Sequence, residues 1–161
     1  MRLNSWKMAL AAFLLVGLVS LPAMAKPAPG LGVFSGVKFN SVDDFDLSHN
    51  FGFFVDLPLV STFYLSPTAD TYTLGEAAVT DLTLAFKFVI PLRGWAPYLG
   101  VLPGLSTVSN DRHFIIGGAG GAYIHLVANL SLLVQVEYKQ IFKDEIEGGT
   151  VHGQGGLLFR F

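Results

Sequence analysis

The stretch TDLTLAFKFVI, residues 80–90, decides the fold of this 161-residue protein. Its apolar residues occupy every second position: Leu82, Leu84, Phe86, Phe88 and Ile90. The positions between them hold Asp81, Thr83, Ala85 and Lys87. Because successive side chains of a β-strand point to opposite faces, this period of two predicts a strand with one apolar and one polar face.

The same alternation recurs along the chain. It is clear in residues 50–57, 129–139 and 151–161, and weaker in residues 31–39, 59–66, 95–102 and 114–126. Helical spacing of apolar residues is not sustained anywhere after residue 30. Together with residues 80–90, these segments predict eight strands and an all-β protein.

The N-terminal segment has the pattern of a secretory signal peptide. A short cationic start is followed by an apolar run over residues 8–21, and Ala23-Met24-Ala25 fits a small-x-small cleavage site. We therefore expect residues 1–25, with Ala23 and Ala25 at the cleavage site, to be removed. A retained membrane anchor is the alternative, but the apolar run is short for a span. No cysteine follows the site, which excludes a lipid-anchored lipoprotein.

Composition limits what the remaining chain can be. Removal of 25 of the 161 residues leaves 136, residues 26–161, which suits one domain. Without Arg2 and Lys7 the 10 basic residues become 8 against 12 acidic ones, a net charge of −4, so no nucleic acid partner is expected. The lack of cysteine excludes a disulfide scaffold. No apolar run of about twenty residues follows, so only strands could span a membrane.

The connections between the predicted strands alternate in length. Longer polar segments are predicted at residues 40–49, 67–76, 106–113 and 143–149, and short turns at Pro58 and at residues 91–94 and 127–129. Tight turns at one end and longer loops at the other are typical of an up-and-down outer-membrane barrel. Pro97 and Pro103 predict a bulge or a shortened fifth strand, because proline cannot donate to the ladder.

Alternation alone does not say which face points outward, since a soluble lipocalin-like barrel has its apolar face inside. The polar faces hold few charges, and most acidic residues fall in the predicted loops: Asp43, Asp44, Asp46, Asp70, Glu76, Asp111, Asp144, Glu145 and Glu147. A wall so poor in charge favours a membrane barrel, with the polar face lining a narrow lumen. We expect mutually compensating charges there. They are Asp81, Lys87, Glu137, Lys139 and Arg160.

Aromatic residues are expected at both edges of the apolar band, as in other membrane barrels. Those predicted at one end are Trp95, Phe159 and Phe161, and those toward the other end are Phe39, Tyr138 and Phe142.

Three stretches carry a resemblance to a known family: APYLGVLPGL at 96–105, GGAGGAYIHLVANLSLLVQVEYK at 117–139 and GGLLFRF at 155–161. They resemble the last four strands of the OmpA/OmpX-like family of small outer-membrane β-barrels. In that family a Pro-Tyr-x-Gly strand precedes a glycine-rich strand, a tight turn, a strand with an inward Glu before a Tyr, and a terminal aromatic strand. The resemblance implies an all-β, eight-stranded antiparallel up-and-down transmembrane β-barrel.

The family resemblance also implies a role for the C-terminal strand. That strand is similar to the signal read by the outer-membrane barrel assembly machinery, so Phe159 and Phe161 are expected to serve in insertion as well as in a girdle. The expected partners are this machinery, outer-membrane lipid and lipopolysaccharide. The expected location is the cell outer membrane, as a monomer.

Some barrels of this class modify lipid A, and a Ser/His pair at the rim could hydrolyse an acyl ester. The histidines are His49, His113, His125 and His152. None lies in the His-x-Ser pattern of the lipid A deacylase family, so no catalytic residue is predicted. The acid-rich segments 43–46 and 143–147 lack calcium-loop spacing, and no metal or cofactor is predicted.

The predicted function is therefore a non-enzymatic structural or surface-interaction role through short acidic loops. A lipid A-modifying enzyme on the same scaffold and a soluble periplasmic lipocalin-like lipid carrier stay open as alternatives. A pore is disfavoured because inward Phe54, Leu133 and Leu158 would block a lumen this narrow.

Overall fold

The computed structural model describes residues 27–40, 47–74, 77–108, 111–143 and 146–161. These residues form nine strands in one antiparallel sheet. The strands are β1 (Gly30–Asn40), β2 (Leu47–Val60), β3 (Phe63–Leu74), β4 (Ala77–Val89), β5 (Trp95–Val101), β6 (Gly104–Val108), β7 (Asp111–Val127), β8 (Leu130–Lys143) and β9 (Ile146–Arg160). Within these residues no helix is long and apolar enough to cross a membrane. The predicted signal peptide, with Ala23 and Ala25, lies outside the described residues.

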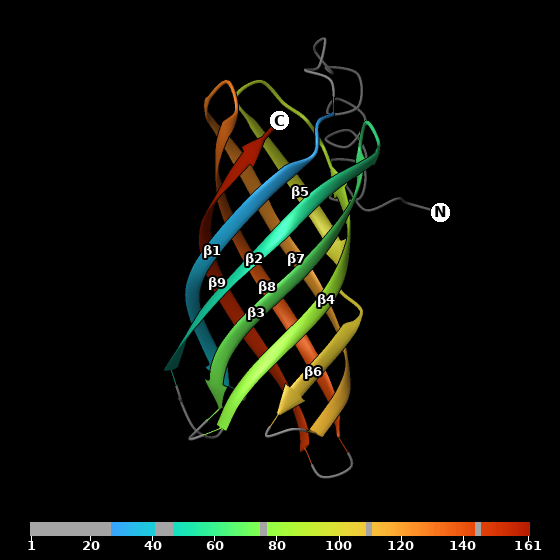
Figure 1. Ribbon diagram of the computed structural model, residues 1–161, viewed down its shortest axis with the longest axis vertical. Helices are drawn as coiled ribbons and strands as arrows, with labels where there is room; N and C mark the ends of the chain where they lie inside the picture. The colour runs from blue at the N-terminus through green and yellow to red at the C-terminus, as the bar shows by residue number, and fades with distance from the viewer. Residues whose placement is uncertain (1–26, 41–46, 75–76, 109–110, 144–145) are drawn as a thin grey trace, which may run out of the picture.

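The sheet closes into a barrel because β1 pairs with β9 as well as with β2. Gly30 lies opposite Arg160 at one end of the closing pair, and Asn40 lies opposite Thr150 at the other. β5 and β6 share one position in the ring, since both lie between β4 and β7, one beyond the other along the barrel (Figure 1). The ring therefore has eight positions in up-and-down order, as the sequence predicts.

The break between β5 and β6 falls at Leu102 and Pro103. Pro103 has no N–H to donate, so the ladder is interrupted there. The contacts beside the break persist: the Pro103 carbonyl accepts from the Leu84 N–H at 2.9 Å, and Leu102 exchanges bonds of 2.9 and 3.0 Å with Gly117. Pro97 stays within β5, opposite Ala122. The strand with the two prolines is thus the one that is interrupted.

Three tight turns lie at the same end of the barrel as the C-terminus and the start of β1, the upper end in Figure 1. They span residues 61–62, 90–94 and 128–129, and Gly94 has the positive φ of 88° that the second turn needs. The turn predicted at Pro58 is wrong by a few residues, because β2 continues to Val60 with a register shift between Pro58 and Val60. We call this end the turn end, and the opposite end the loop end.

The long loops predicted at the other end are wrong in extent. β3 continues to Leu74, β7 begins at Asp111, β8 continues to Lys143, and β9 begins at Ile146. Within the β3 extension, Thr68 and Tyr72 are buried while Thr71 and Thr73 point outward. Because the outward face of this extension carries no large apolar residues, the apolar alternation used to find strands did not reveal it.

Most of the large apolar side chains in the described strands point out of the barrel. In β4, Leu82 is 56% exposed and Phe86 46%, whereas their neighbours Asp81 and Lys87 are 0% and 4% exposed. The six predicted girdle residues are exposed, three near the turn end and three toward the loop end: Trp95, Phe159, Phe161, Phe39, Tyr138 and Phe142. This arrangement is the reverse of a lipocalin-like barrel, whose apolar side chains would line a cavity.

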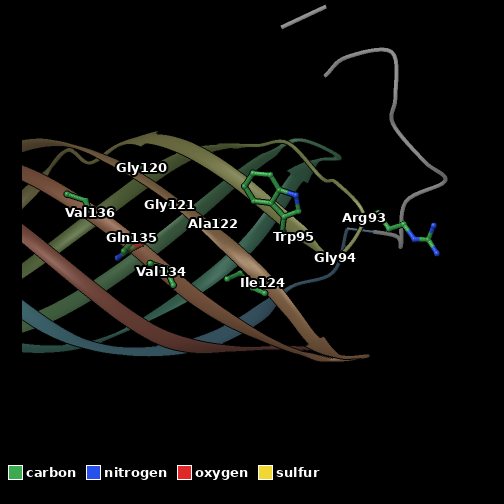
Figure 2. A pocket seen from close by; sticks show the side chains of 10 residues that line it. All are labelled: Arg93, Gly94, Trp95, Gly120, Gly121, Ala122, Ile124, Val134, Gln135 and Val136. Carbon is green, nitrogen blue, oxygen red and sulfur yellow. The ribbon is translucent and has the colours of Figure 1, made fainter. Parts of the chain in front are cut away.

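A shallow hollow marks the outer wall where β5, β7 and β8 lie side by side (Figure 2). We call it the wall groove. Gly120, Gly121 and Ala122 of β7 line the groove. The absence of a side chain at Gly121 leaves space inside the barrel for Tyr98, because a Cβ at Gly121 would lie 2.9 Å from the Tyr98 hydroxyl. The remaining lining residues come from β8, the end of β7, the turn before β5 and the start of β5: Val134, Gln135, Val136, Ile124, Arg93, Gly94 and Trp95.

Candidate functional site

The candidate site is the barrel interior, where buried charged side chains gather. Seven are at most 4% exposed: Lys38, Asp56, Asp70, Asp81, Lys87, Glu137 and Lys139. Arg160 joins them, partly buried, at the turn end. The described part of the lumen thus holds four cations and four carboxylates, which fits the need to compensate charge in a confined interior.

The turn-side cluster is built around one ion pair. Lys87 Nζ lies 3.1 Å from Asp56 Oδ1 and donates a 2.9 Å hydrogen bond to the Tyr123 hydroxyl. The Ser66 hydroxyl donates to the same oxygen of Asp56. Lys87 Nζ also lies 4.5 Å from the centre of the Phe54 ring, a cation–π contact. Each charge of this pair is therefore met by a partner from another strand.

The loop-side cluster places three carboxylates around one ammonium group. Lys139 Nζ lies 2.8 Å from Asp70 Oδ1, 3.2 Å from Asp81 Oδ2 and 3.5 Å from Glu137 Oε2. The Tyr72 hydroxyl donates to Asp81 at 3.2 Å. A second cation is close, since Lys38 Nζ lies 3.7 Å from the centre of the Tyr72 ring.

Gln135 connects the two clusters. Its side-chain carbonyl accepts from the Tyr98 hydroxyl, and its amide donates to Gln154 and, at 2.9 Å, to Glu137 of the loop-side cluster. The Tyr98 ring stacks on Tyr123 of the turn-side cluster, with ring centres 5.0 Å apart. A chain of contacts therefore links the clusters along the lumen, and buried polar networks of this kind fix side-chain positions when their members are satisfied.

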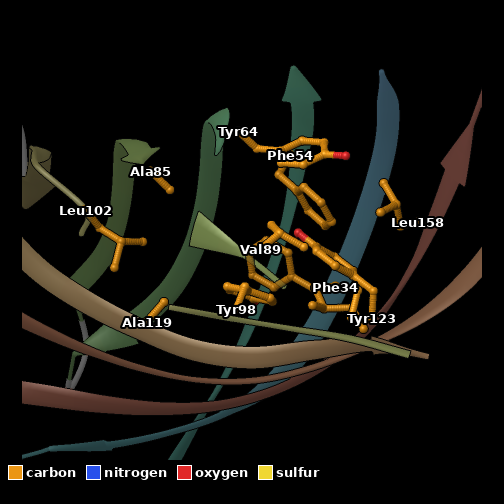
Figure 3. Close-up of a cluster of buried hydrophobic side chains, with 12 residues drawn as sticks. Phe34, Phe54, Tyr64, Ala85, Val89, Tyr98, Leu102, Ala119, Tyr123 and Leu158 are labelled. Atoms are coloured by element: carbon orange, nitrogen blue, oxygen red, sulfur yellow. The ribbon is translucent and has the colours of Figure 1, made fainter. Parts of the chain in front are cut away.

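Apolar and aromatic side chains fill the lumen toward the turn end (Figure 3). We call this group the plug; its members are Phe34, Phe54, Tyr64, Ala85, Val89, Ala96, Tyr98, Leu102, Ala119, Tyr123, Leu133 and Leu158. Phe54, Leu133 and Leu158, placed inward by the sequence pattern, are 2%, 0% and 0% exposed. The plug also uses glycine: a Cβ at Gly32 would lie 2.2 Å from the Phe54 ring.

The structure brings together three of the five charged residues that the sequence analysis grouped. Asp81, Glu137 and Lys139 meet in the loop-side cluster. Lys87 also points into the lumen, but its carboxylate partner is Asp56 of the turn-side cluster.

Arg160, the fifth member of the predicted group, lies at the edge of the turn-side cluster, beside the Tyr123 ring. Its guanidinium is 5.4 Å from the centre of the Tyr64 ring and 5.3 Å from that of Tyr123. It also donates a 3.2 Å hydrogen bond to the carbonyl of Ala28, so it ties the end of β9 to the chain just before β1.

Three lumen charges were missed or misplaced. Asp70 was predicted to lie in a long loop, which is wrong: it is 2% exposed and pairs with Lys139. Asp56 and Lys38 were not included in the predicted group. Parity was the available signal, because Asp56 lies two positions from Phe54 and Lys38 four positions from Phe34, so each shares the inward face of its strand.

At the loop end, the neighbouring Ser48 and His49 lie on opposite faces of β2. Ser48 is buried and His49 is exposed, as neighbours in one strand must be when one of them points inward. His152 is buried in the lumen, 2.9 Å from the Thr150 hydroxyl. At the turn end, His125 Nδ1 lies 3.0 Å from the Ser131 hydroxyl, a contact between a potential base and a potential nucleophile.

No set of three or more His, Cys, Asp or Glu side chains that could hold a metal ion occurs within the residues that the structure describes. Most of the predicted acidic loop residues, among them residues 43–46 and 144–145, lie outside that part of the chain.

No protein-family model matches the chain, and no curated protein matches it in sequence. Solved structures do match its fold. Neisserial surface protein A aligns with a TM-score of 0.73 at 12% identity, over 86% of this chain and 100% of that one. Ail, the attachment invasion locus protein of Yersinia pestis, solved with the heparin analogue sucrose octasulfate, gives 0.60 at 9%, over 85% and 100%. The outer membrane enzyme PagL gives 0.55 at 12%, over 82% and 99%.

Proposed function

Because the chain has the fold of the small outer-membrane β-barrels, we propose that it is a non-enzymatic integral protein of the outer membrane. It would be exported through a cleaved signal peptide and act in envelope structure or surface interaction, as a monomer. The observation that carries this proposal is the inversion of the barrel: apolar side chains outside, compensated charges inside.

A bilayer demands this inversion. The hydrocarbon region offers no hydrogen bonds to the backbone, so a spanning sheet must close on itself, as β1 and β9 do here. It also excludes charge from the outer face, and on β4 that face carries Leu82, Leu84, Phe86 and Phe88. The buried lysines and carboxylates satisfy each other within the lumen.

A surface role is supported by the wall at the loop end. On β3 the outward positions at the loop end of the extension are Thr71 and Thr73, which suit water or sugar better than hydrocarbon. This part of the wall would project beyond the apolar band, toward lipopolysaccharide headgroups. Lipopolysaccharide, outer-membrane lipid and the barrel assembly machinery are therefore the proposed partners.

Cell fractionation tests the proposal. The protein should appear in the outer-membrane fraction, and its detergent-extracted form should migrate differently on a gel before and after boiling, because closed barrels resist the detergent until heated. Recovery from the soluble periplasmic extract would refute membrane residence.

A lipid A-modifying enzyme is the second candidate. It is favoured by the shared fold with PagL and by the contact between His125 and Ser131. Two observations weigh against it: Ser131 is only 2% exposed, and the pair lies at the turn end, which in the proposed orientation faces the periplasm and not the outer leaflet. Comparing lipid A masses from cells with the wild-type protein and with Ser131→Ala tests it. A mass change that disappears in the variant would establish the enzyme.

A further inference from the structure

The geometry points to a lipid-binding site in the wall groove: an anionic phospholipid of the turn-end leaflet, with its acyl chain over Gly120 and Ala122 and its phosphate at Arg93. This inference rests on the proposed membrane location. It names a site and a ligand class that the fold alone does not require.

The groove is a shallow hollow in the apolar wall, on which an acyl chain can lie. A Cβ on Gly120 would meet only Leu99 Cδ2, at 3.4 Å, so the missing side chain leaves open space there. The lining side chains on either side stand out from the wall, with Trp95 46% and Val134 49% exposed. Apolar burial cannot select a ligand inside a bilayer, because lipid surrounds the whole wall. Van der Waals fit and polar contacts must select it, and a hollow gives a flexible chain more contact than a convex wall does.

Arg93 supplies the charge. It is exposed in the turn before β5, and Figure 2 shows its guanidinium extending beyond the end of the barrel, past Trp95. A guanidinium there would meet a phosphate at the level of the headgroups, where it can form two parallel hydrogen bonds. The Trp95 ring, amphipathic and at the same end, suits the boundary between headgroup and chain.

A second copy of the chain is a poorer occupant. All copies inserted in one membrane have the same orientation, so a two-fold axis between them runs along the membrane normal. A symmetric contact through the groove would bring both Arg93 guanidinium groups together at the turn end, and like charges repel. A lipid phosphate is negatively charged and therefore attracts the Arg93 guanidinium.

Trp95 is a built-in probe, because the chain has two tryptophans and the other is Trp6 in the predicted signal peptide. We would refold the full chain with Trp6→Phe into phosphatidylcholine vesicles. Two vesicle samples would be compared, each containing a few per cent of a lipid with brominated acyl chains, which quench Trp95 fluorescence. The brominated lipid is phosphatidylglycerol in one sample and phosphatidylcholine in the other. The expected result is about fivefold stronger apparent binding of the phosphatidylglycerol, the ratio that about 1 kcal/mol per cationic side chain at a membrane surface gives.

Matched variants separate a site from general attraction. Arg93→Gln should remove the preference for phosphatidylglycerol, whereas Arg112→Gln, which removes an exposed cation at the loop end, should keep it. Gly120→Val should weaken it by filling the groove. Gly153→Val is the control on β9, since a Cβ there meets only Val37 Cγ2, at 3.9 Å. The gel shift on heating verifies that each variant is folded.

Three outcomes would overturn the inference. Equal quenching by both lipids means that the groove is ordinary wall. Weak quenching by both brominated lipids, which becomes stronger in Gly120→Val, means that a second copy of the chain covers the groove. A preference lost in Arg93→Gln but unchanged in Gly120→Val means surface attraction without binding in the groove. Failure of the membrane proposal is distinguishable, because the protein would then be found in the soluble periplasmic extract.

Discussion

Lys139 has three carboxylates within 3.5 Å of its ammonium group, and its side chain is 1% exposed. Replacing it by methionine keeps most of the side-chain volume but leaves Asp70, Asp81 and Glu137 without their shared cation. Removing one partner of a buried ion pair costs about 3–5 kcal/mol, so we expect Lys139→Met to lower the free energy of unfolding by that amount. Urea titration of the barrel in lipid vesicles, followed by the gel shift between folded and unfolded bands, measures it.

Two further variants make this result specific to the cluster. Arg112→Met removes a cation that is exposed, and should change the free energy of unfolding by no more than about 0.5 kcal/mol. Adding Asp70→Asn to Lys139→Met removes one of the unpaired carboxylates and should restore part of the loss. A loss below about 1 kcal/mol in Lys139→Met would mean that water compensates the carboxylates instead.

At the scale of elements, the end of β3 distinguishes a wall from a loop. The chain contains no cysteine, so single cysteines can be introduced cleanly. Thr71→Cys and Thr73→Cys place a thiol outside the barrel, and Thr68→Cys places one inside, where the native side chain is 8% exposed. A membrane-impermeant maleimide should label the first two in the folded protein and leave the third unlabelled until urea unfolds it. Equal labelling of all three cysteines would mean that this segment is a loop, as the sequence predicted, and not part of the barrel wall.

At the scale of the whole molecule, the plug should prevent conduction. Wild-type protein in a planar bilayer should give no steady current, because Phe54 and its neighbours fill the lumen. The double variant Phe54→Ala and Leu133→Ala should give current steps, at a cost in stability of about 3–5 kcal/mol for the phenylalanine alone. Phe53→Ala is the matched control, since Phe53 is the next residue but 54% exposed on the outside. Current through wild type would place the conducting path elsewhere.

Assembly of the molecule in cells provides a second test at this scale. Phe161 is 69% exposed, and the centres of the Phe161 and Phe159 rings are 5.8 Å apart. Phe161 therefore contributes little to the stability of the folded barrel. If it also forms part of an insertion signal, Phe161→Ala should reduce the amount in the outer membrane several-fold while leaving urea stability in vesicles within about 0.5 kcal/mol. Phe63→Ala, which removes another exposed ring paired with a neighbour, should leave assembly unchanged. Equal assembly of both variants would reduce Phe161 to a girdle residue.

The sequence by itself determined the strands and the facing of their side chains. Parity is local: once Leu82 and Phe86 point to lipid, Asp81 and Lys87 must point inward, whatever the rest of the chain does. The same parity holds for Phe54, which the pattern placed in the lumen before any neighbour was known. Eight such segments with tight turns between alternate pairs sufficed for the architecture.

Only the tertiary structure decided how far the strands extend and which lumen charges meet. At the polar end of β3 the two faces do not differ in hydrophobicity, so the sequence pattern does not reveal a strand. Its pairing with β4 makes this segment part of the barrel wall. Lys139 and Asp70 are 69 residues apart, and Lys87 and Asp56 are 31 apart. Whether two inward side chains lie at the same height depends on the stagger accumulated around the closed ring, a property of all the strand registers together. No single stretch of sequence contains that quantity.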